Sequence, residues 1–410
     1  MKFLRRKIGL ALLPLTIVGC VGDRHKTSQH SLSGKLISSQ SVPVPSSVSG
    51  AGRAYFFKYG MDGVGGHIVE AQSLLLLPQR PVPAGGWPVV AWGHGTDGGI
   101  SNACATSLDP DLGGYGNTII SRLLTEGYAV VAPDYEGFGT VDVHPYLHLR
   151  SEGTSLIYAV KAAQGVAQGL SPSWAAVGHS QGGHAVLGAA QYADTLVPEL
   201  HYRGTVAMAP FSNAGRTVAD LFALVDQYTV QGDISDAADR LAFIQAGAAF
   251  SGAAADFYNP GADPSALGGS GLVPLVAEAA NDHPCGEGTF TQTLSTDISN
   301  YLSGGGDPRS YPGLRRDWLT TTDATAFPYQ QWLTTLSEPG TVHLGEPVMI
   351  AQGQLDTNNS VGAADLLVSR LKANHDIVTY AVYSGTSHDD LPVVSADDTV
   401  AYLKELFAKP

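Results

Sequence analysis

Short, uniformly apolar runs alternate with amphipathic runs along most of this chain. The apolar runs predict strands at residues 69–77, 89–92, 129–132, 175–177, 205–208, 347–351 and 377–383. Helical spacing of apolar residues predicts helices at 118–124, 156–163, 182–192 and 363–372, and a last helix that Ser395 is placed to cap. Strands without polar alternation are buried on both faces, so the pattern predicts an α/β fold with a mostly parallel sheet and helices on both faces.

One long segment interrupts this pattern. Residues 211–346 separate two predicted strands, which is far more than one crossover between parallel strands needs. The segment has helical periodicity at 218–227 and 236–250, and Gly-rich turns near Gly261 and Gly304. We interpret it as a mainly helical cap inserted into a core formed by 53–210 and 347–410. A loosely ordered surface insertion is the alternative, which the periodicity disfavours.

The first 20 residues have the features of an export signal. Four cations precede an apolar run at 8–18, which is too short to span a bilayer. The run ends in Ile-Val-Gly-Cys, which resembles the lipobox of bacterial lipoproteins, so Cys20 is predicted to be the lipidated first residue of the mature chain. An ordinary secretory signal is the alternative. In the lipoprotein reading, Val21 in place of Asp favours the outer membrane or cell surface.

The remaining sequence fits an exported domain held by an anchor. Residues 21–52 are predicted to be a flexible tether, because residues 21–50 are rich in Ser and contain no aromatic residue. Cys104 and Cys285 form an even pair for an oxidising compartment, so we predict a disulfide between them, with two separate buried thiols as the alternative. The formal net charge of −14 argues against nucleic acid as a partner, and leaves the lipid anchor as the expected membrane contact. Oligomeric state is left open.

A nucleophile motif follows the strand predicted at 175–177. Gly178-His179-Ser180-Gln181-Gly182 fits the pattern G-x-S-x-G, in which the Ser occupies a sharp turn from strand to helix. Glycines two residues to either side let the strand and the helix pass close to the turn. The sequence therefore predicts that Ser180 is the nucleophile of an α/β-hydrolase fold, at a helix N-terminus that favours developing negative charge.

A carboxylate and an imidazole follow two later strands in the order that this fold requires. Asp356 lies just beyond the strand at 347–351, and His388 just beyond the next one. We predict that His388 takes the proton of Ser180 and that Asp356 orients His388. Asp134, beyond an earlier strand, is the alternative acid.

Other histidines are expected to be structural. His144 and His148 have a spacing that suits metal ligands on a helix, but Pro145 between them predicts a loop, so we expect pocket-lining or structural roles and no metal. His179 and His184 are expected to pack.

Two backbone N–H groups are needed to bind the oxyanion of a tetrahedral intermediate. One is predicted to be that of Gln181, directly after the nucleophile. The other is expected in the loop after the strand at 89–92, where Gly95 allows close approach of substrate. Thr96 is the predicted donor and Asp97 the alternative.

These residues together resemble the secretory lipase family, the fungal lipase A type with bacterial relatives. The likeness covers residues 53–407 and includes Trp-Gly-His-Gly-Thr at 92–96, the segment 128–135, the Ser180 motif, the helical insert and the late Asp and His. It implies an esterase or lipase with a cap over an acyl pocket and no cofactor. The expected reaction is ester hydrolysis through an acyl-enzyme at Ser180. An amidase or peptidase using the same residues, and a ligand-binding lipoprotein without catalysis, are the alternatives.

Overall fold

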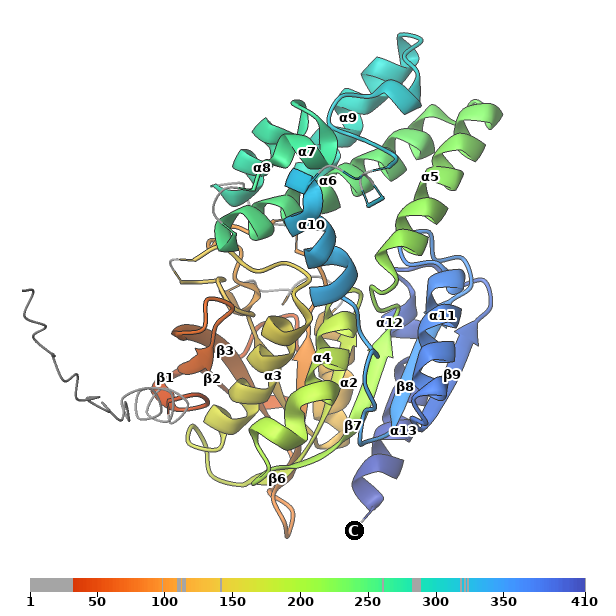
Figure 1. Cartoon of the computed structure of the whole chain (residues 1–410). Helices are drawn as coiled ribbons and strands as arrows, with labels where there is room; N and C mark the ends of the chain where they lie inside the picture. Colours follow the sequence, from red (N-terminus) through yellow and green to blue (C-terminus); the bar gives the residue numbers. More distant parts are fainter. Residues whose placement is uncertain are drawn as a thin grey trace, which may run out of the picture.

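One sheet organises the protein (Figure 1). The computed structural model describes residues 32–409, except 98, 109–111, 113–115, 141, 260–261, 282–288, 318, 321 and 323. Its strands are β1 Leu36–Val42, β2 Ala51–Asp62, β3 Ile68–Pro78, β4 Trp87–Gly93, β5 Ala129–Pro133, β6 Leu170–His179, β7 His201–Met208, β8 Val348–Gly353 and β9 Val378–Tyr383. Their order is β1-β2-β3-β5-β4-β6-β7-β8-β9, and every pairing from β5 to β9 is parallel. The predicted mostly parallel sheet is confirmed.

The antiparallel edge of the sheet contains part of the segment, residues 21–52, that was predicted to be a flexible tether. Strand β1 lies within residues 21–52 and pairs with β2 from Leu36 opposite Tyr59 to Val42 opposite Ala54. The prediction of a flexible tether is therefore wrong from β1 onward. The side chains of β1 are mostly exposed, so backbone hydrogen bonds hold the strand and its Ser-rich sequence carries no apolar signal. Residues 21–31 lie outside the described part of the chain.

Helices cover both faces of the sheet. One face packs against α3 Leu149–Ala163, α4 Gln181–Leu196 and α11 Val361–Ala373, and the other against α2 Gly116–Glu126, α12 Leu391–Val394 and α13 Ala396–Ala408. Strand β3 shows why both faces are apolar, because Leu75 and Leu77 join the first layer while Leu74 and Leu76 join the second.

The last helix begins where the sequence predicts, with a different contact at its start. Ser395 directly precedes α13, but its hydroxyl donates to the carbonyl of Leu391 at 2.7 Å and does not cap the helix. The short helix α12 just before it supplies that acceptor.

The interrupting segment forms a second helical layer above the carboxyl ends of the parallel strands, at the top of Figure 1. It contains α5 Ala214–Gln231, α6 Ile234–Tyr258, α7 Pro264–Gly268, α8 Leu272–Ala280, α9 Thr289–Ser303, α10 Phe327–Gln331 and the π-helical turn η4 Trp332–Leu336. These elements share an apolar core, which Ile100, Tyr146 and Leu147 join from loops of the sheet domain. We call this segment the cap. No helix in the described residues combines the length and apolar character needed to cross a membrane.

The helices α3 and α4 approach each other closely through two glycines. A Cβ added to Gly153 would lie 2.4 Å from the carbonyl carbon of Gly188, and one added to Gly188 would lie 2.3 Å from the carbonyl oxygen of Leu149. Both distances are far below van der Waals contact, so glycine at both positions lets the two backbones touch.

We expect Gly188→Ala to lower the free energy of unfolding by about 2 kcal/mol or more, because the methyl group must push α3 away from α4. Gly215→Ala is the matched control, since a Cβ there meets no atom within 4 Å in helix α5. Urea denaturation of both variants measures the difference. Equal stability of the two variants would contradict the proposed close contact.

Candidate active site

Ser180 occupies a sharp turn between β6 and α4. Its backbone dihedral angles are φ 58° and ψ −117°, which a residue with a side chain rarely adopts. A Cβ on Gly178 would lie 2.2 Å from the carbonyl oxygen of Gly182, and one on Gly182 would lie 1.9 Å from that of Gly93. The glycines of the motif are thus required by contact between the turn and the end of β4.

The loop after β4 lies beside this turn. A Cβ added to Gly95 would be 3.8 Å from the Cβ of Ser180. A cavity of about 170 Å³ opens here, and Ser180, His388, Thr96 and Gln181 all line it. The structure therefore brings four of the predicted site residues to one cavity.

Asp356 and His388 form a buried pair at the ends of β8 and β9. His388 Nδ1 lies 2.7 Å from Asp356 Oδ2, and both residues are less than 9% exposed. The other carboxylate oxygen accepts the backbone N–H groups of Asn358 and Asn359, each at 2.8 Å. A carboxylate with these donors is an acceptor, so His388 donates from Nδ1 and its Nε2 is left to accept a proton.

No hydrogen bond joins Ser180 Oγ to His388 among the described residues. Both side chains line the same cavity, with the imidazole held from behind by Asp356. In unliganded enzymes such bonds are often long and tighten when substrate binds.

His179 holds the His388 loop against the nucleophile turn. Its Nε2 donates to the backbone oxygen of His388 at 3.0 Å, and the two rings lie 4.5 Å apart. Burial, and then the nearby His388, lower the pKa of His179 well below its ordinary value, so the ring is neutral. His179 therefore packs as expected and also forms a specific hydrogen bond to the His388 loop.

Asp134 has other partners. Its carboxylate accepts from Gln72 Nε2 and Thr106 Oγ1, each at 2.9 Å, and from the backbone and hydroxyl of Ser107. Burial raises its pKa. These contacts tie β3 and β5 to the loop near Ser107. Within the described part of the chain, no hydrogen bond or ion pair joins Asp134 to His388, so the structure favours Asp356 as the partner of the imidazole.

The two predicted oxyanion donors are linked through their side chains. Thr96 Oγ1 donates to Gln181 Oε1 at 3.2 Å and lies 3.0 Å from the hydroxyl of Tyr146. Gln181 is the first residue of α4, so its N–H has no partner within the helix. No acceptor for the N–H of Thr96 is found among the described residues.

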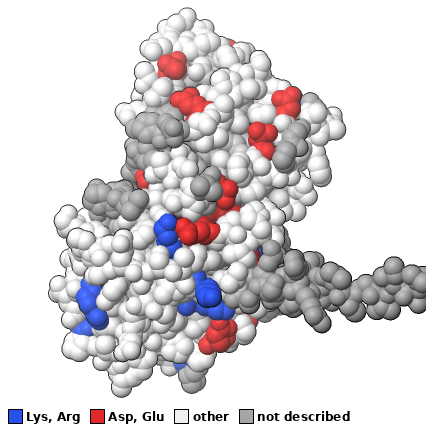
Figure 2. Space-filling view, turned by 90° about the vertical axis from the view of Figure 1, so that its left-hand side faces the viewer, with Lys and Arg blue, Asp and Glu red and all other residues white. Residues whose placement is uncertain are grey.

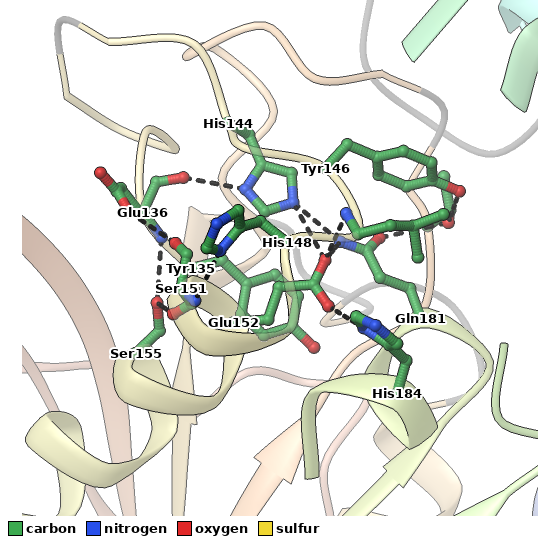
Figure 3. A network of polar contacts seen from close by, with 12 residues as sticks. Tyr135, Glu136, His144, Tyr146, His148, Ser151, Glu152, Ser155, Gln181 and His184 are labelled. Atoms are coloured by element: carbon green, nitrogen blue, oxygen red, sulfur yellow. Dashed lines mark hydrogen bonds and ion pairs between the residues drawn. The ribbon is translucent and has the colours of Figure 1, made fainter. Parts of the chain in front are cut away.

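Sequence reasoning missed Glu152, which lies at the centre of a buried polar network beneath this site (Figure 3). Its carboxylate contacts Gln181 Nε2 at 2.8 Å, the Leu147 N–H at 2.9 Å and His184 Nδ1 at 2.5 Å. Burial alone would raise the pKa of Glu152, but the nearby His184 and the hydrogen bond from it lower that pKa. The sequence does contain a sign of this residue. Glu152 lies three residues after Leu149 and four before Leu156, so it is an acid on the apolar face of α3.

The two loop histidines are structural. His144 Nδ1 lies 2.9 Å from the carbonyl of Glu136, and its Nε2 lies 2.8 Å from Gln181 Nε2. His148 precedes α3 and accepts the N–H of Ser151 at 3.2 Å. Within the described residues, no group of three or more His, Cys, Asp or Glu side chains is placed to hold a metal ion.

A second, apolar cavity of about 100 Å³ adjoins the first inside the cap. It shares Thr96, Tyr146 and Phe211 with the nucleophile cavity. Its remaining walls come largely from α5 and α6, including Leu221 and Gly247. Space for an apolar group therefore lies next to the site.

The cysteines are described only in part. Cys104 is buried and disulfide-bonded. Its predicted partner Cys285 lies outside the described residues, as do Cys20 and the whole export signal.

Comparison with known proteins agrees with this geometry. The secretory lipase family model matches residues 104–239, which confirms the predicted resemblance over that stretch. No curated protein matches the chain. Among solved structures, the Xanthomonas oryzae esterase LipA, described as degrading rice cell walls, is 19% identical with a TM-score of 0.65, covering 90% of this chain and 95% of that one.

Two further solved structures have the same fold. Candida antarctica lipase A in its closed state is 18% identical with a TM-score of 0.65, and covers 92% of this chain and 82% of its own. A Legionella pneumophila protein described as a putative hydrolase is 14% identical with a TM-score of 0.65, covering 92% and 99%. These structures confirm the predicted α/β-hydrolase fold. The family match supports an ester hydrolase of the lipase or esterase type.

His94, two residues before the predicted oxyanion donor Thr96, provides a pH-dependent test of this loop. Burial lowers its pKa from 6.5 to about 4, so the folded protein holds it neutral. Above pH 6.5 the ring is neutral in both the folded and the unfolded chain. As the pH falls from 6.5 toward 4, the unfolded chain binds a proton that the folded chain does not bind, and the free energy of unfolding decreases by roughly 3 kcal/mol. We expect His94→Asn to remove this part of the pH dependence, measured by urea denaturation between pH 7 and 4. Parallel curves for the two proteins would contradict the buried neutral state.

Proposed function

We propose that this protein hydrolyses carboxylic esters through an acyl-enzyme at Ser180. One observation carries the proposal: the strained Ser180 turn and His388, which Asp356 holds from behind, line the same cavity. The adjoining apolar cavity fits the acyl part of an ester, and the family match supports the same class of reaction.

The chemistry follows from these positions. His388 Nε2 takes the proton of Ser180 as Oγ attacks the carbonyl carbon of the ester. The backbone N–H groups of Gln181 and Thr96 stabilise the oxyanion of the tetrahedral intermediate. The C–O bond of the ester breaks, His388 protonates the leaving alkoxide, and a water molecule then releases the acid by the same steps. Asp356 stabilises the imidazolium throughout.

One face of the cap bears on the charge of the substrate. On the face shown in Figure 2, the upper part of the molecule carries acidic but no basic side chains. Together with the net charge of −14, this surface disfavours an anionic polymer as partner. The substrate would be a small-molecule or lipid ester whose recognition is apolar.

We also propose that the enzyme works outside the cytoplasm. This part rests on the sequence: an export signal ending at Cys20, which is the proposed lipid attachment site in the cell envelope. The disulfide at Cys104 supports an oxidising compartment, and Cys285 is its proposed partner.

We expect Ser180→Ala to lower kcat on p-nitrophenyl esters at least about 10⁴-fold, because no other group can form the acyl-enzyme. Asp356→Asn should cost a similar factor, since the imidazole loses its orienting carboxylate. Hydrolysis rates and labelling by a fluorophosphonate probe measure both effects.

Asp134→Asn is the matched control, because Asp134 is an equally buried carboxylate that contacts other residues. A larger loss from Asp134→Asn than from Asp356→Asn would overturn the assigned acid. Full activity of Ser180→Ala would overturn the nucleophile. Faster cleavage of matched anilides than of esters would make the protein an amidase, and failure to label with the probe would favour a binding protein.

The apolar cavity should set the acyl chain length. Gly247 lines it, and a Cβ there meets no atom within 4 Å, so Gly247→Leu would fill the space without displacing α6. We expect about 10-fold or greater loss of kcat/KM on p-nitrophenyl octanoate and little change on the acetate. Gly215→Leu, at an equally open position on α5 that does not line the cavity, is the control. An equal loss on both esters would place the acyl chain elsewhere.

A further inference from the structure

The buried network beneath the site reaches both proposed oxyanion donors. We propose that Glu152 is a positioning residue, whose carboxylate fixes Gln181 and, through it, Thr96, so that their N–H groups are aligned before substrate binds. This inference rests on the proposed function, because it concerns the oxyanion hole of that reaction. Glu152 itself does not touch the reacting atoms.

The hydrogen bonds assign the orientation of the Gln181 amide. Its Nε2 lies 2.8 Å from Glu152 Oε1, which can only accept. The same Nε2 lies 2.8 Å from His144 Nε2, and His144 donates from Nδ1 to the Glu136 carbonyl, so its Nε2 is also an acceptor. Both hydrogens of the amide nitrogen are therefore used, and Gln181 Oε1 faces the other way.

That oxygen in turn holds the second donor. Gln181 Oε1 accepts the hydroxyl hydrogen of Thr96, so the hydroxyl of Tyr146 must be the donor in its own contact with Thr96. Tyr146 is fixed as well, because its carbonyl accepts the indole N–H of Trp332 in the cap at 2.8 Å. A chain of directed hydrogen bonds thus runs from Glu152 to the loop after β4.

His184 explains why the acid must be charged. Its Nδ1 faces Glu152 Oε2, and its Nε2 lies 2.7 Å from the backbone carbonyl of Ser337 at the end of the cap. Both partners are acceptors, so both contacts are hydrogen bonds only in the imidazolium form, in which each ring nitrogen carries hydrogen. A fully buried imidazolium needs a buried anion, and Glu152 supplies it.

Only a carboxylate meets all of these demands together. Glu152 accepts from Gln181, from the Leu147 N–H and from His184, and a neutral amide has one oxygen for the three. Because Gln181 begins α4 directly after the nucleophile, holding its side chain at both ends limits rotation of the backbone that carries its N–H. The effect should therefore fall on stabilisation of the transition state and leave substrate binding intact.

The test is a double-mutant cycle between Glu152→Gln and Gln181→Ala on the full exported chain, using p-nitrophenyl butyrate. Each single variant should lower kcat about 10- to 100-fold with KM within about twofold, as expected for misplaced oxyanion donors. Inhibition by a trifluoromethyl ketone, whose adduct with Ser180 places an oxyanion in the hole, should weaken by a similar factor. In the Gln181→Ala background, Glu152→Gln should cost less than about twofold more.

Glu136→Gln is the control, because Glu136 is a buried carboxylate of the same region that bonds Ser151 and not Gln181. It should lower stability and leave kcat per titrated site unchanged. Since Glu152→Gln removes the partner of a buried cation and could unfold the chain, Thr96→Val supplies a second test. That variant keeps the backbone N–H, removes the hydroxyl, and should reproduce the kcat loss and the weaker ketone inhibition.

The outcomes separate the two proposals. A wild-type protein without serine-dependent ester hydrolysis would remove the proposed function and this inference with it. An active wild type with full kcat and ketone inhibition in folded Glu152→Gln, or in Thr96→Val if the first is unfolded, would overturn only the positioning role. Additive losses in the cycle would also overturn it, because Glu152 would then act by a route other than Gln181.

Discussion

The site depends on a contact between two pieces of backbone. The end of β4 and the start of α4 touch so closely that a methyl group at Gly182 would lie 1.9 Å from the carbonyl oxygen of Gly93. This contact holds Ser180 at φ 58° and brings Gly95 and the loop after it beside the Ser180 turn. The positions of Ser180 and of the Thr96 N–H are thus set by main-chain packing, which side-chain motion cannot relax.

The parallel sheet then supplies the other groups. Strands β8 and β9 end at the same edge as β6, so Asp356 and His388 arrive next to Ser180 although they lie far along the chain. His179, adjacent to Ser180, donates to the backbone of His388 and so links the two loops. Each group is therefore held by an element of the core, while the cap contributes the apolar walls.

What the sequence predicts correctly is local. The Ser180 motif can be recognised from the residues next to Ser180, because they meet the steric demands of the turn. The buried strands can be recognised from their own apolar residues, without knowledge of the strands that they pair with. Strand β1 was not predicted because its side chains are mostly exposed. Backbone hydrogen bonds hold an exposed strand, and they do not require a particular pattern of side chains. Glu152 was not predicted because its partners Gln181 and His184 lie about 30 residues away on another helix. Without knowledge of these partners, a single acid within a helix is expected to face solvent.

The helix contact and the buried acid are two parts of one arrangement. Gly153, which lets α3 touch α4 at Gly188, directly follows Glu152. The carboxylate therefore extends from the residue next to this contact and reaches both Gln181 and His184 in the first turn of α4. A buried ion pair adds little to stability compared with apolar packing of the same volume. Its contribution here is geometric, because three donors from two segments, the loop before α3 and the first turn of α4, meet at one carboxylate and leave the start of α4 a single position.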